Sequence, residues 1–173
     1  ISLYQLERWV EIDSIWIPIL EPLPSSLGFP LTFVDPEVET DVRSYTYRCV
    51  VYNECQVVVT TSNIGKTILL QGWRSTNANA FENSLIWSEY EEFPDGTLSY
   101  EILRAPTRLS AAAPLTSLGA SVYHTEDYIG DLTEMPGDFC YTVVALENNP
   151  TGGLNGASSN QVCLTEEPLV WIP

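Results

Sequence analysis

The stretch "GDFCYTVVALENNPTGGLNGASSNQVCL", residues 137–164, consists of two short apolar runs separated by a polar loop. Both runs are rich in aromatic and β-branched residues, and the loop contains the Gly, Pro, Asn and Ser residues that favour turns. The stretch therefore predicts an antiparallel hairpin. The loop lies midway between Cys140 and Cys163, so the two side chains can face each other across neighbouring strands, where Cβ atoms lie roughly 4.5–5.5 Å apart. We expect a disulfide here; two reduced, half-buried cysteines are the alternative.

Outward from this hairpin, the chain repeats itself. "YQLER" at 4–8 matches "YEILR" at 100–104, the segment 33–52 resembles 124–146, and "SNIGKTILL" at 62–70 resembles "SNQVCLT" at 159–165. The three matches are separated by 96, 94 and 97 residues, measured from Tyr4 to Tyr100, from Tyr47 to Tyr141 and from Ser62 to Ser159. A nearly constant separation over three ordered blocks indicates two copies of one module.

Each copy has the alternating pattern of β-strands. In the second copy Leu85 and Trp87 fall on one side of a strand and Ile86 on the other. Many short strands separated by Gly, Pro and Asn turns favour a β-sandwich, and no segment has a convincing helical period. The predicted fold class is all-β, with two tandem β-sandwiches.

Composition limits the partners. The chain has 173 residues, with 23 acidic and 7 basic side chains and a net charge of −16. Such a chain repels phosphate groups, so we expect no nucleic-acid partner. No apolar run approaches the roughly 18 residues of a membrane-spanning helix, so we expect no membrane insertion.

Several of these residues resemble the pattern of fibronectin type III domains. In that pattern a tryptophan lies in the second strand, as Trp87 would, and a tyrosine opens the sixth strand, as Tyr47 and Tyr141 would. Asp35 and Asp127 match the residue that often leads into that strand. An Asx-turn is a sufficient physical reason for an aspartate there. The resemblance implies that the two sandwiches are of the fibronectin type III or immunoglobulin-like kind, the N-terminal one lacking its first strands.

The second copy also resembles a narrower family, the fibronectin-like domain that precedes the gliding-motility-type (type B) C-terminal sorting domain in large surface proteins of Bacteroidota. A Cys-Tyr-x-Val-x-Ala strand, an Ser-Asn-x-x-Cys strand and a Pro-x-hydrophobic-Ile-Pro joint carry the resemblance. The matching residues are Phe139, Cys140, Tyr141, Val143, Ala145, Ser159, Asn160, Cys163, Pro168, Ile172 and Pro173. The resemblance implies an extracellular, cell-surface location, with the type IX secretion machinery and neighbouring domains of the same chain as partners.

These patterns divide the chain into three parts. Residues 1–72 are expected to form the truncated first domain, 73–167 the second domain, and 168–173 a linker to a following domain. The first copy begins at its "YQLER" block, without the two strands that precede "YEILR" in the second copy. We therefore expect the natural protein to continue upstream of this segment, and the resemblance implies that it continues downstream as well.

Candidate catalytic and metal-binding residues are few. His124 is the single histidine, and a surface position on a strand is expected for it rather than a catalytic one. The acidic clusters at 35–41 and 89–95 lack the calcium-loop pattern, so we expect no cofactor; a calcium site and a glycosidase carboxylate pair are the alternatives. Cys49 takes the place of an apolar core residue, and it could pair with Cys55 only if the chain turns at Tyr52–Asn53.

Three tryptophans are candidate ligand contacts, since aromatic rings can stack on sugars or anchor a partner. Trp9 and Trp16 lie in a predicted hairpin, where core packing is the alternative, and Trp73 lies at the joint between the copies. "DSI" at 13–15 resembles the O-glycosylation acceptor of Bacteroidota, which makes Ser14 a candidate modification site.

The sequence therefore predicts a non-catalytic stalk or spacer of a large secreted surface protein of the gliding or adhesin type, next to its C-terminal secretion signal. Surface polysaccharide or other adhesins are the expected external partners. The alternative is a carbohydrate-binding accessory module of a secreted enzyme. A catalytic domain is a third hypothesis and would need an acid–base pair around His124 or the acidic clusters.

Overall fold

The computed structural model describes residues 3–27, 32–75, 81–130, 137–149 and 156–166. The chain divides into two compact units, Ile1–Thr67 and Ile68–Pro173. The predicted boundary between residues 72 and 73 falls inside a strand, β7 (Leu70–Arg74), which belongs entirely to the second unit. The predicted linker at 168–173 lies outside the described residues.

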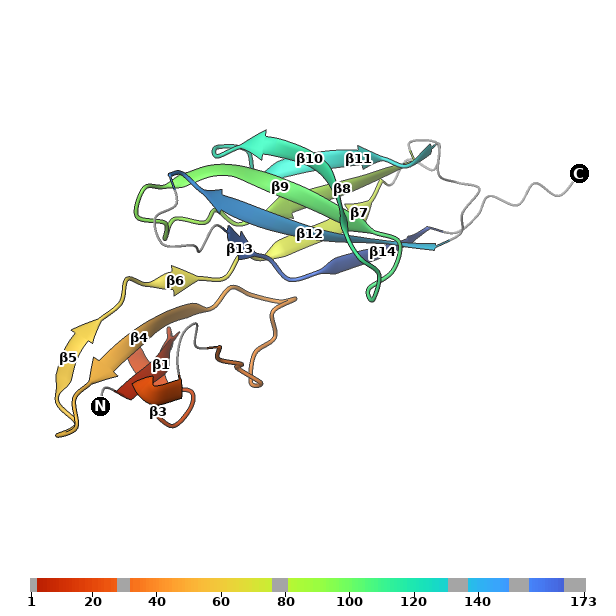
Figure 1. Cartoon of the computed structure of the whole chain (residues 1–173). Helices are drawn as coiled ribbons and strands as arrows, with labels where there is room; N and C mark the ends of the chain where they lie inside the picture. The colour runs from red at the N-terminus through yellow and green to blue at the C-terminus, as the bar shows by residue number, and fades with distance from the viewer. Residues whose placement is uncertain (1–2, 28–31, 76–80, 131–136, 150–155, 167–173) are drawn as a thin grey trace, which may run out of the picture. The chain divides into compact units, whose positions relative to one another are not determined.

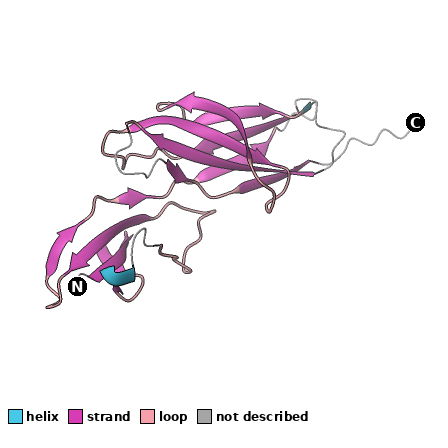
Figure 2. Ribbon diagram, viewed as in Figure 1, coloured by secondary structure: helices cyan, strands magenta, loops and turns pink. Residues whose placement is uncertain are grey.

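Unit 1 contains one antiparallel sheet in the order β2–β1–β4–β5, with β3 paired to β1 and β6 paired to β4 (Figures 1 and 2). Its elements are β1 (Leu3–Val10), β2 (Ile15–Pro18), β3 (Leu23–Pro24), the short 3₁₀ turn η1 (Ser25–Leu27), β4 (Thr46–Tyr52), β5 (Val58–Thr61) and β6 (Gly65–Lys66). The turn between β4 and β5 is held by Asn53, whose side-chain oxygen accepts hydrogen bonds from the backbone nitrogens of Cys55 and Val57.

Unit 2 contains two antiparallel sheets. Its strands are β7 (Leu70–Arg74), β8 (Glu82–Trp87), β9 (Thr97–Ala105), β10 (Ala113–Gly119), β11 (His124–Tyr128), β12 (Gly137–Glu147), β13 (Gly156–Ser158) and β14 (Val162–Glu166). One sheet has the order β10–β9–β12–β13 with β14 also on β12, and the other has the order β11–β8–β7 (Figure 1).

The core of unit 2 lies between these two sheets. Leu85 and Trp87 of β8 are buried, whereas the intervening Ile86 is 41% exposed, as the alternating pattern predicts. The Trp87 ring packs on Tyr100 of the facing sheet, with 5.7 Å between ring centroids. The predicted all-β sandwich is therefore confirmed, and the described residues contain no α-helix.

The internal repeat extends to the register of the strands. In unit 1, β1 pairs with β4 so that Tyr4, Leu6 and Arg8 lie opposite Val51, Cys49 and Tyr47. In unit 2, β9 pairs with β12 so that Tyr100, Ile102 and Arg104 lie opposite Ala145, Val143 and Tyr141. Each of these pairs occupies the corresponding position of the repeat. The sheet of unit 1 is therefore a second copy of the β10–β9–β12 sheet with its β13 and β14 edge.

Within the described part of the chain, the second sheet of the sandwich is found in unit 2 only. Among the described residues of unit 1, no strand corresponds to β7, β8 or β11. The segment around Asp35 corresponds to β11, and it is not a strand. In unit 2, β11 pairs with β8, and the described residues of unit 1 contain no strand in the place of β8 with which the Asp35 segment could pair.

Candidate functional site

A buried polar cluster connects the two sheets of unit 2. Arg104 of β9 donates through Nη1 to both carboxylate oxygens of Asp127 in β11, at 3.0 and 2.7 Å. The Tyr141 hydroxyl in β12 donates to Asp127 Oδ2 at 2.7 Å and accepts a hydrogen bond from Asn83 Nδ2 of β8 at 2.9 Å. Burial raises the pKa of Tyr141, and the hydrogen bond to Asp127 acts in the same direction.

Unit 1 builds the same cluster at the corresponding positions. Arg8 Nη1 lies 2.5 Å from Asp35 Oδ2, and the Tyr47 hydroxyl donates to that same oxygen at 3.2 Å. Burial and the neighbouring Asp35 raise the pKa of Tyr47 to about 12. The guanidinium of Arg8 also lies over the ring of Tyr45 at 5.8 Å.

The ring contact is duplicated as well. Arg104 lies over Phe139 at 6.0 Å, and Phe139 is the counterpart of Tyr45. The two arginines stand at the end of the repeated "YQLER" and "YEILR" blocks, which is the sequence feature that could have identified them before the structure. Neither arginine is among the candidate site residues predicted from the sequence.

The charged and polar groups of the cluster are bonded to one another. Each carboxylate is neutralised by an arginine and accepts a hydrogen bond from a tyrosine. The raised pKa of each tyrosine keeps its hydroxyl protonated, so that it remains a hydrogen-bond donor to the aspartate.

The expected Asx-turn is confirmed for one aspartate and wrong for the other. Asp35 Oδ1 accepts a hydrogen bond from the backbone nitrogen of Glu37 at 3.1 Å. Asp127 instead lies within β11, and its carboxylate binds Arg104 and Tyr141. Strand pairing of β11 with β8 leaves no local turn for Asp127 to stabilise.

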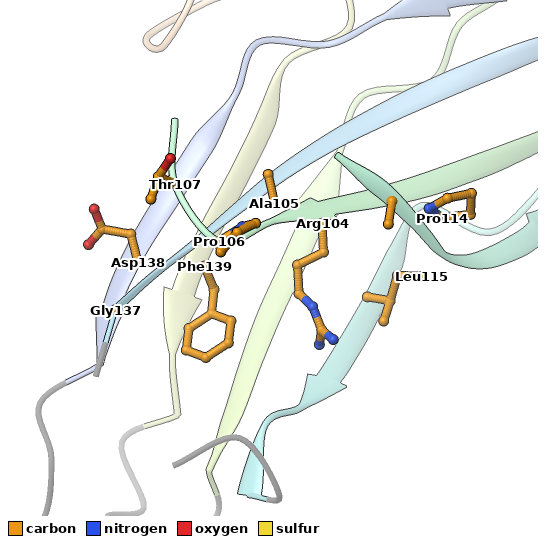
Figure 3. Close-up of a pocket in the computed structure, with 10 residues that line it drawn as sticks. Arg104, Ala105, Pro106, Thr107, Pro114, Leu115, Gly137, Asp138 and Phe139 are labelled. Carbon is orange, nitrogen blue, oxygen red and sulfur yellow. The ribbon is translucent and has the colours of Figure 1, made fainter. Parts of the chain in front are cut away.

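Beside the unit 2 cluster lies a pocket of about 610 Å³, formed at one end of β9, β10 and β12 (Figure 3). Arg104 and Phe139 extend to the same side of their strands, whereas Asp138 points away from them (Figure 3). Asp138 accepts a hydrogen bond from the Thr165 hydroxyl at 2.6 Å. The volume suits a small ligand, but the charged groups at the pocket are already engaged in pairs within the unit.

The two cysteines of the hairpin predicted at residues 137–164 form a disulfide. Cys140 of β12 and Cys163 of β14 lie directly opposite each other and are bonded, which confirms the predicted link. The corresponding positions in unit 1 are Thr46 and Lys66, which also lie opposite each other. The second copy therefore has a disulfide at this place in the sheet, and the first copy has a threonine and a lysine there.

The candidate disulfide between Cys49 and Cys55 is not formed, and both are free thiols. The chain does turn after Tyr52, yet the strand register separates the two residues. Cys49 lies within β4, where its backbone exchanges hydrogen bonds with Ser62. Cys55 lies in the turn itself and is exposed.

The structure brings two of the three candidate tryptophans together. Trp9 and Trp16 lie opposite each other on β1 and β2, with ring centroids 5.3 Å apart. The guanidinium of Arg48 lies 4.3 Å over the Trp16 ring and also pairs with Glu7. One face of Trp16 is therefore already covered. Trp73 belongs to unit 2, where it lies in β7 and is 50% exposed.

The remaining candidates are separate surface positions. His124 is the first residue of β11 and is exposed, as predicted. Ser14 lies in the exposed turn between β1 and β2, with a positive φ of 51°. Among the described residues, no group of three or more His, Cys, Asp or Glu side chains could hold a metal ion. No helix in that part of the chain is long and apolar enough to cross a membrane.

Comparison with known proteins identifies no family. No family model matches the chain, and no curated protein matches it. Among solved structures, a similar chain is the pectate lyase PelI from Erwinia chrysanthemi in complex with tetragalacturonic acid. The two are 18% identical, with a TM-score of 0.44, over 56% of this chain and 28% of the lyase chain.

Proposed function

We propose that this chain is a non-catalytic stalk segment of a secreted cell-surface protein of the gliding or adhesin type, next to its C-terminal secretion signal. The observation that carries the proposal is the duplication of the arginine–aspartate–tyrosine cluster at matching register in both units. The arginine and the aspartate are paired with each other inside each unit, and the tyrosine donates to the aspartate, so the cluster supports a role in holding each copy of the module together.

The disulfide supports an exported location. Disulfides persist mainly in oxidising compartments outside the cytosol, and Cys140–Cys163 links β12 to β14 in unit 2. In a stalk, such a link shortens the length of chain that tension can release. The 23 residues of sequence separation correspond to about 80 Å of extended chain.

A replacement experiment tests the stalk role. In the surface protein that the proposal implies, residues 1–173 are exchanged for an unrelated pair of sandwiches of similar length. A stalk predicts that secretion, surface display and adhesion all continue. Loss of adhesion with normal display would contradict the proposal, since it would mean that this segment itself binds a partner.

A carbohydrate-binding accessory module is the second candidate function. The partly exposed Trp9–Trp16 pair and the half-exposed Trp73 ring favour it, because exposed aromatic rings can stack on sugar rings. A polysaccharide panel with single Trp9→Ala, Trp16→Ala and Trp73→Ala variants tests it. Saturable binding that one variant abolishes, without loss of folding, would favour this function over the stalk.

A further inference from the structure

Every second side chain of the β11–β8–β7 sheet points away from the core of unit 2. Leu70, Leu85 and Asp127 point inward and are buried, so the residues between them lie on the opposite face of the sheet. We call this face the outer platform. Its residues are all at least partly exposed, and they are Gln71, Trp73, Glu82, Ser84, Ile86, His124, Glu126 and Tyr128.

Strand pairing aligns the platform residues in rows across the sheet. Trp73 lies opposite Ser84, and Ser84 lies opposite Glu126, so these three form one row. Tyr128 lies in the neighbouring row, opposite Glu82. The spacing of strands and the rise per residue place the Cα atoms of Trp73 and Tyr128 roughly 12 Å apart. A ligand that contacts both rings is therefore an extended chain that crosses β8.

The two aromatic rings of the platform are accessible. Trp73 is 50% exposed and Tyr128 is 60% exposed. In the part of the chain that the structure describes, neither ring packs on another aromatic ring or on an arginine. The Tyr128 ring lies against Gly130, where a Cβ atom would clash with it. The glycine therefore allows the ring to lie along the backbone, and both rings are open to a stacking partner.

The polar side chains between the rings are also open to a partner. Within the described residues, no hydrogen bond or ion pair engages the side chains of Gln71, Glu82, Ser84 or Glu126. A carboxylate only accepts hydrogen bonds, whereas an amide and a hydroxyl both donate and accept. The platform therefore suits a ligand that carries many hydroxyl groups.

The charge and the size of the platform exclude other classes of ligand. It carries two carboxylates and neither lysine nor arginine, on a chain with a net charge of −16, so phosphate, sulfate and uronate groups are repelled. A stable protein interface takes roughly 20–30 residues on each side around an apolar centre. The platform is much smaller and has a single aliphatic residue, Ile86.

We propose that the outer platform of unit 2 binds a neutral polysaccharide chain. Its sugar rings stack on Trp73 and Tyr128, and its hydroxyl groups bind Glu126 and the polar side chains beside it. The inference rests on the second candidate function, carbohydrate binding, and assigns to it a site and a class of glycan. That site lies in unit 2, whereas the Trp9–Trp16 pair belongs to unit 1.

Calorimetric titration of the whole chain tests the proposal. The probes are soluble glucan, mannan and xylan, which are neutral, and alginate, which is anionic. We expect saturable binding of at least one neutral probe and no binding of alginate. Tyr128→Ala and Glu126→Gln should each raise the Kd of the neutral probe at least about tenfold. Glu126→Gln keeps the shape of the side chain, so it tests the site even if Tyr128→Ala disturbs β11.

Matched controls lie away from the platform. Trp16→Ala in unit 1 and Leu109→Ala in the exposed β9–β10 loop should leave the Kd unchanged. Binding that is lost in Trp16→Ala but kept in Tyr128→Ala and Glu126→Gln would overturn the platform and leave carbohydrate binding standing. Absence of binding to every neutral probe would overturn both. Tighter binding of alginate than of the neutral probes would overturn the assigned class of glycan.

Discussion

The Tyr141 hydroxyl offers the sharpest test of the cluster in unit 2. Tyr141 is 0% exposed, and its hydroxyl reaches from β12 of one sheet to Asn83 and Asp127, which lie opposite each other on adjacent strands of the other sheet. Tyr141→Phe removes one oxygen and keeps the ring that fills the core. It leaves the buried amide of Asn83 without its acceptor, while Asp127 keeps both hydrogen bonds from Arg104.

The expected loss follows from these two bonds. A buried neutral hydrogen bond contributes about 1 kcal/mol, and a bond to a charged acceptor contributes about 1.5–3 kcal/mol. We expect Tyr141→Phe to lower the free energy of unfolding of unit 2 by about 3 kcal/mol. For a unit of this size that corresponds to a Tm lower by roughly 10–20 °C. Tyr47→Phe is the matched control, and we expect a loss of about 1 kcal/mol because it removes one longer bond at a partly exposed position.

The assay measures unfolding in urea by the hydrogen exchange of peptides from each unit, which reports the stability of unit 1 and of unit 2 separately. Peptides from β8, β9 and β12 should lose protection in Tyr141→Phe, with peptides of unit 1 unchanged. A loss below about 1 kcal/mol in Tyr141→Phe, or an equal loss in both variants, would refute the reasoning. The first result would mean that the hydroxyl contacts of Tyr141 contribute little and that ring packing supports the cluster. The second would mean that burial and the extra bond from Asn83 add nothing to the contribution of the hydroxyl.

Four further changes have defined outcomes. Reduction of Cys140–Cys163, with a separation of 23 residues, should lower the free energy of unfolding of unit 2 by about 3 kcal/mol through chain entropy; urea unfolding with and without reductant measures it, and equal midpoints would contradict it. The pKa of Tyr47 is raised from 10.0 to about 12, so the unfolded chain releases its proton first and the stability of unit 1 should fall between about pH 10 and pH 12; Tyr47→Phe should flatten that part of the pH profile, and an unaltered slope would count against the assignment. Gln56 has a positive φ of 58°, so Gln56→Gly should raise the free energy of unfolding of unit 1 by roughly 0.5–1 kcal/mol, and a lower urea midpoint would disprove this. A Cβ at Gly72 would lie 2.9 Å from a Leu85 methyl carbon, so Gly72→Ala should destabilise unit 2 by about 1–3 kcal/mol, and a neutral thermal melt would show that the strands can yield.

The same arginine–aspartate–tyrosine contacts form in both units, although the two units differ in structure around the aspartate. Arg8 and Arg104 each bind an aspartate and lie over an aromatic ring, although the two aspartates lie in different local structures. The arginine–aspartate–tyrosine contacts therefore persist where the strand around the aspartate does not. This indicates that the cluster depends mainly on the shared β1–β4 and β9–β12 sheet.

Local patterns determined much of the fold. Period-two alternation around Trp87 predicts which side chains are buried, and the turn residues between Cys140 and Cys163 predict a hairpin that brings the two cysteines together. The spacing of the repeated blocks predicts two copies of one module. These features depend on near neighbours in the chain or on self-comparison, so the sequence alone carries them.

Only the tertiary structure decided the side-chain partners. Arg8 and Asp35 are 27 residues apart and meet because β1 and the segment before β4 lie together. Cys49 forms no disulfide with Cys55, because the strand register places Ser62 beside Cys49. Arg48 covers one face of Trp16 because it extends across from β4. Such contacts depend on which strands are adjacent and in what register, and the side-chain pattern of a single strand contains neither.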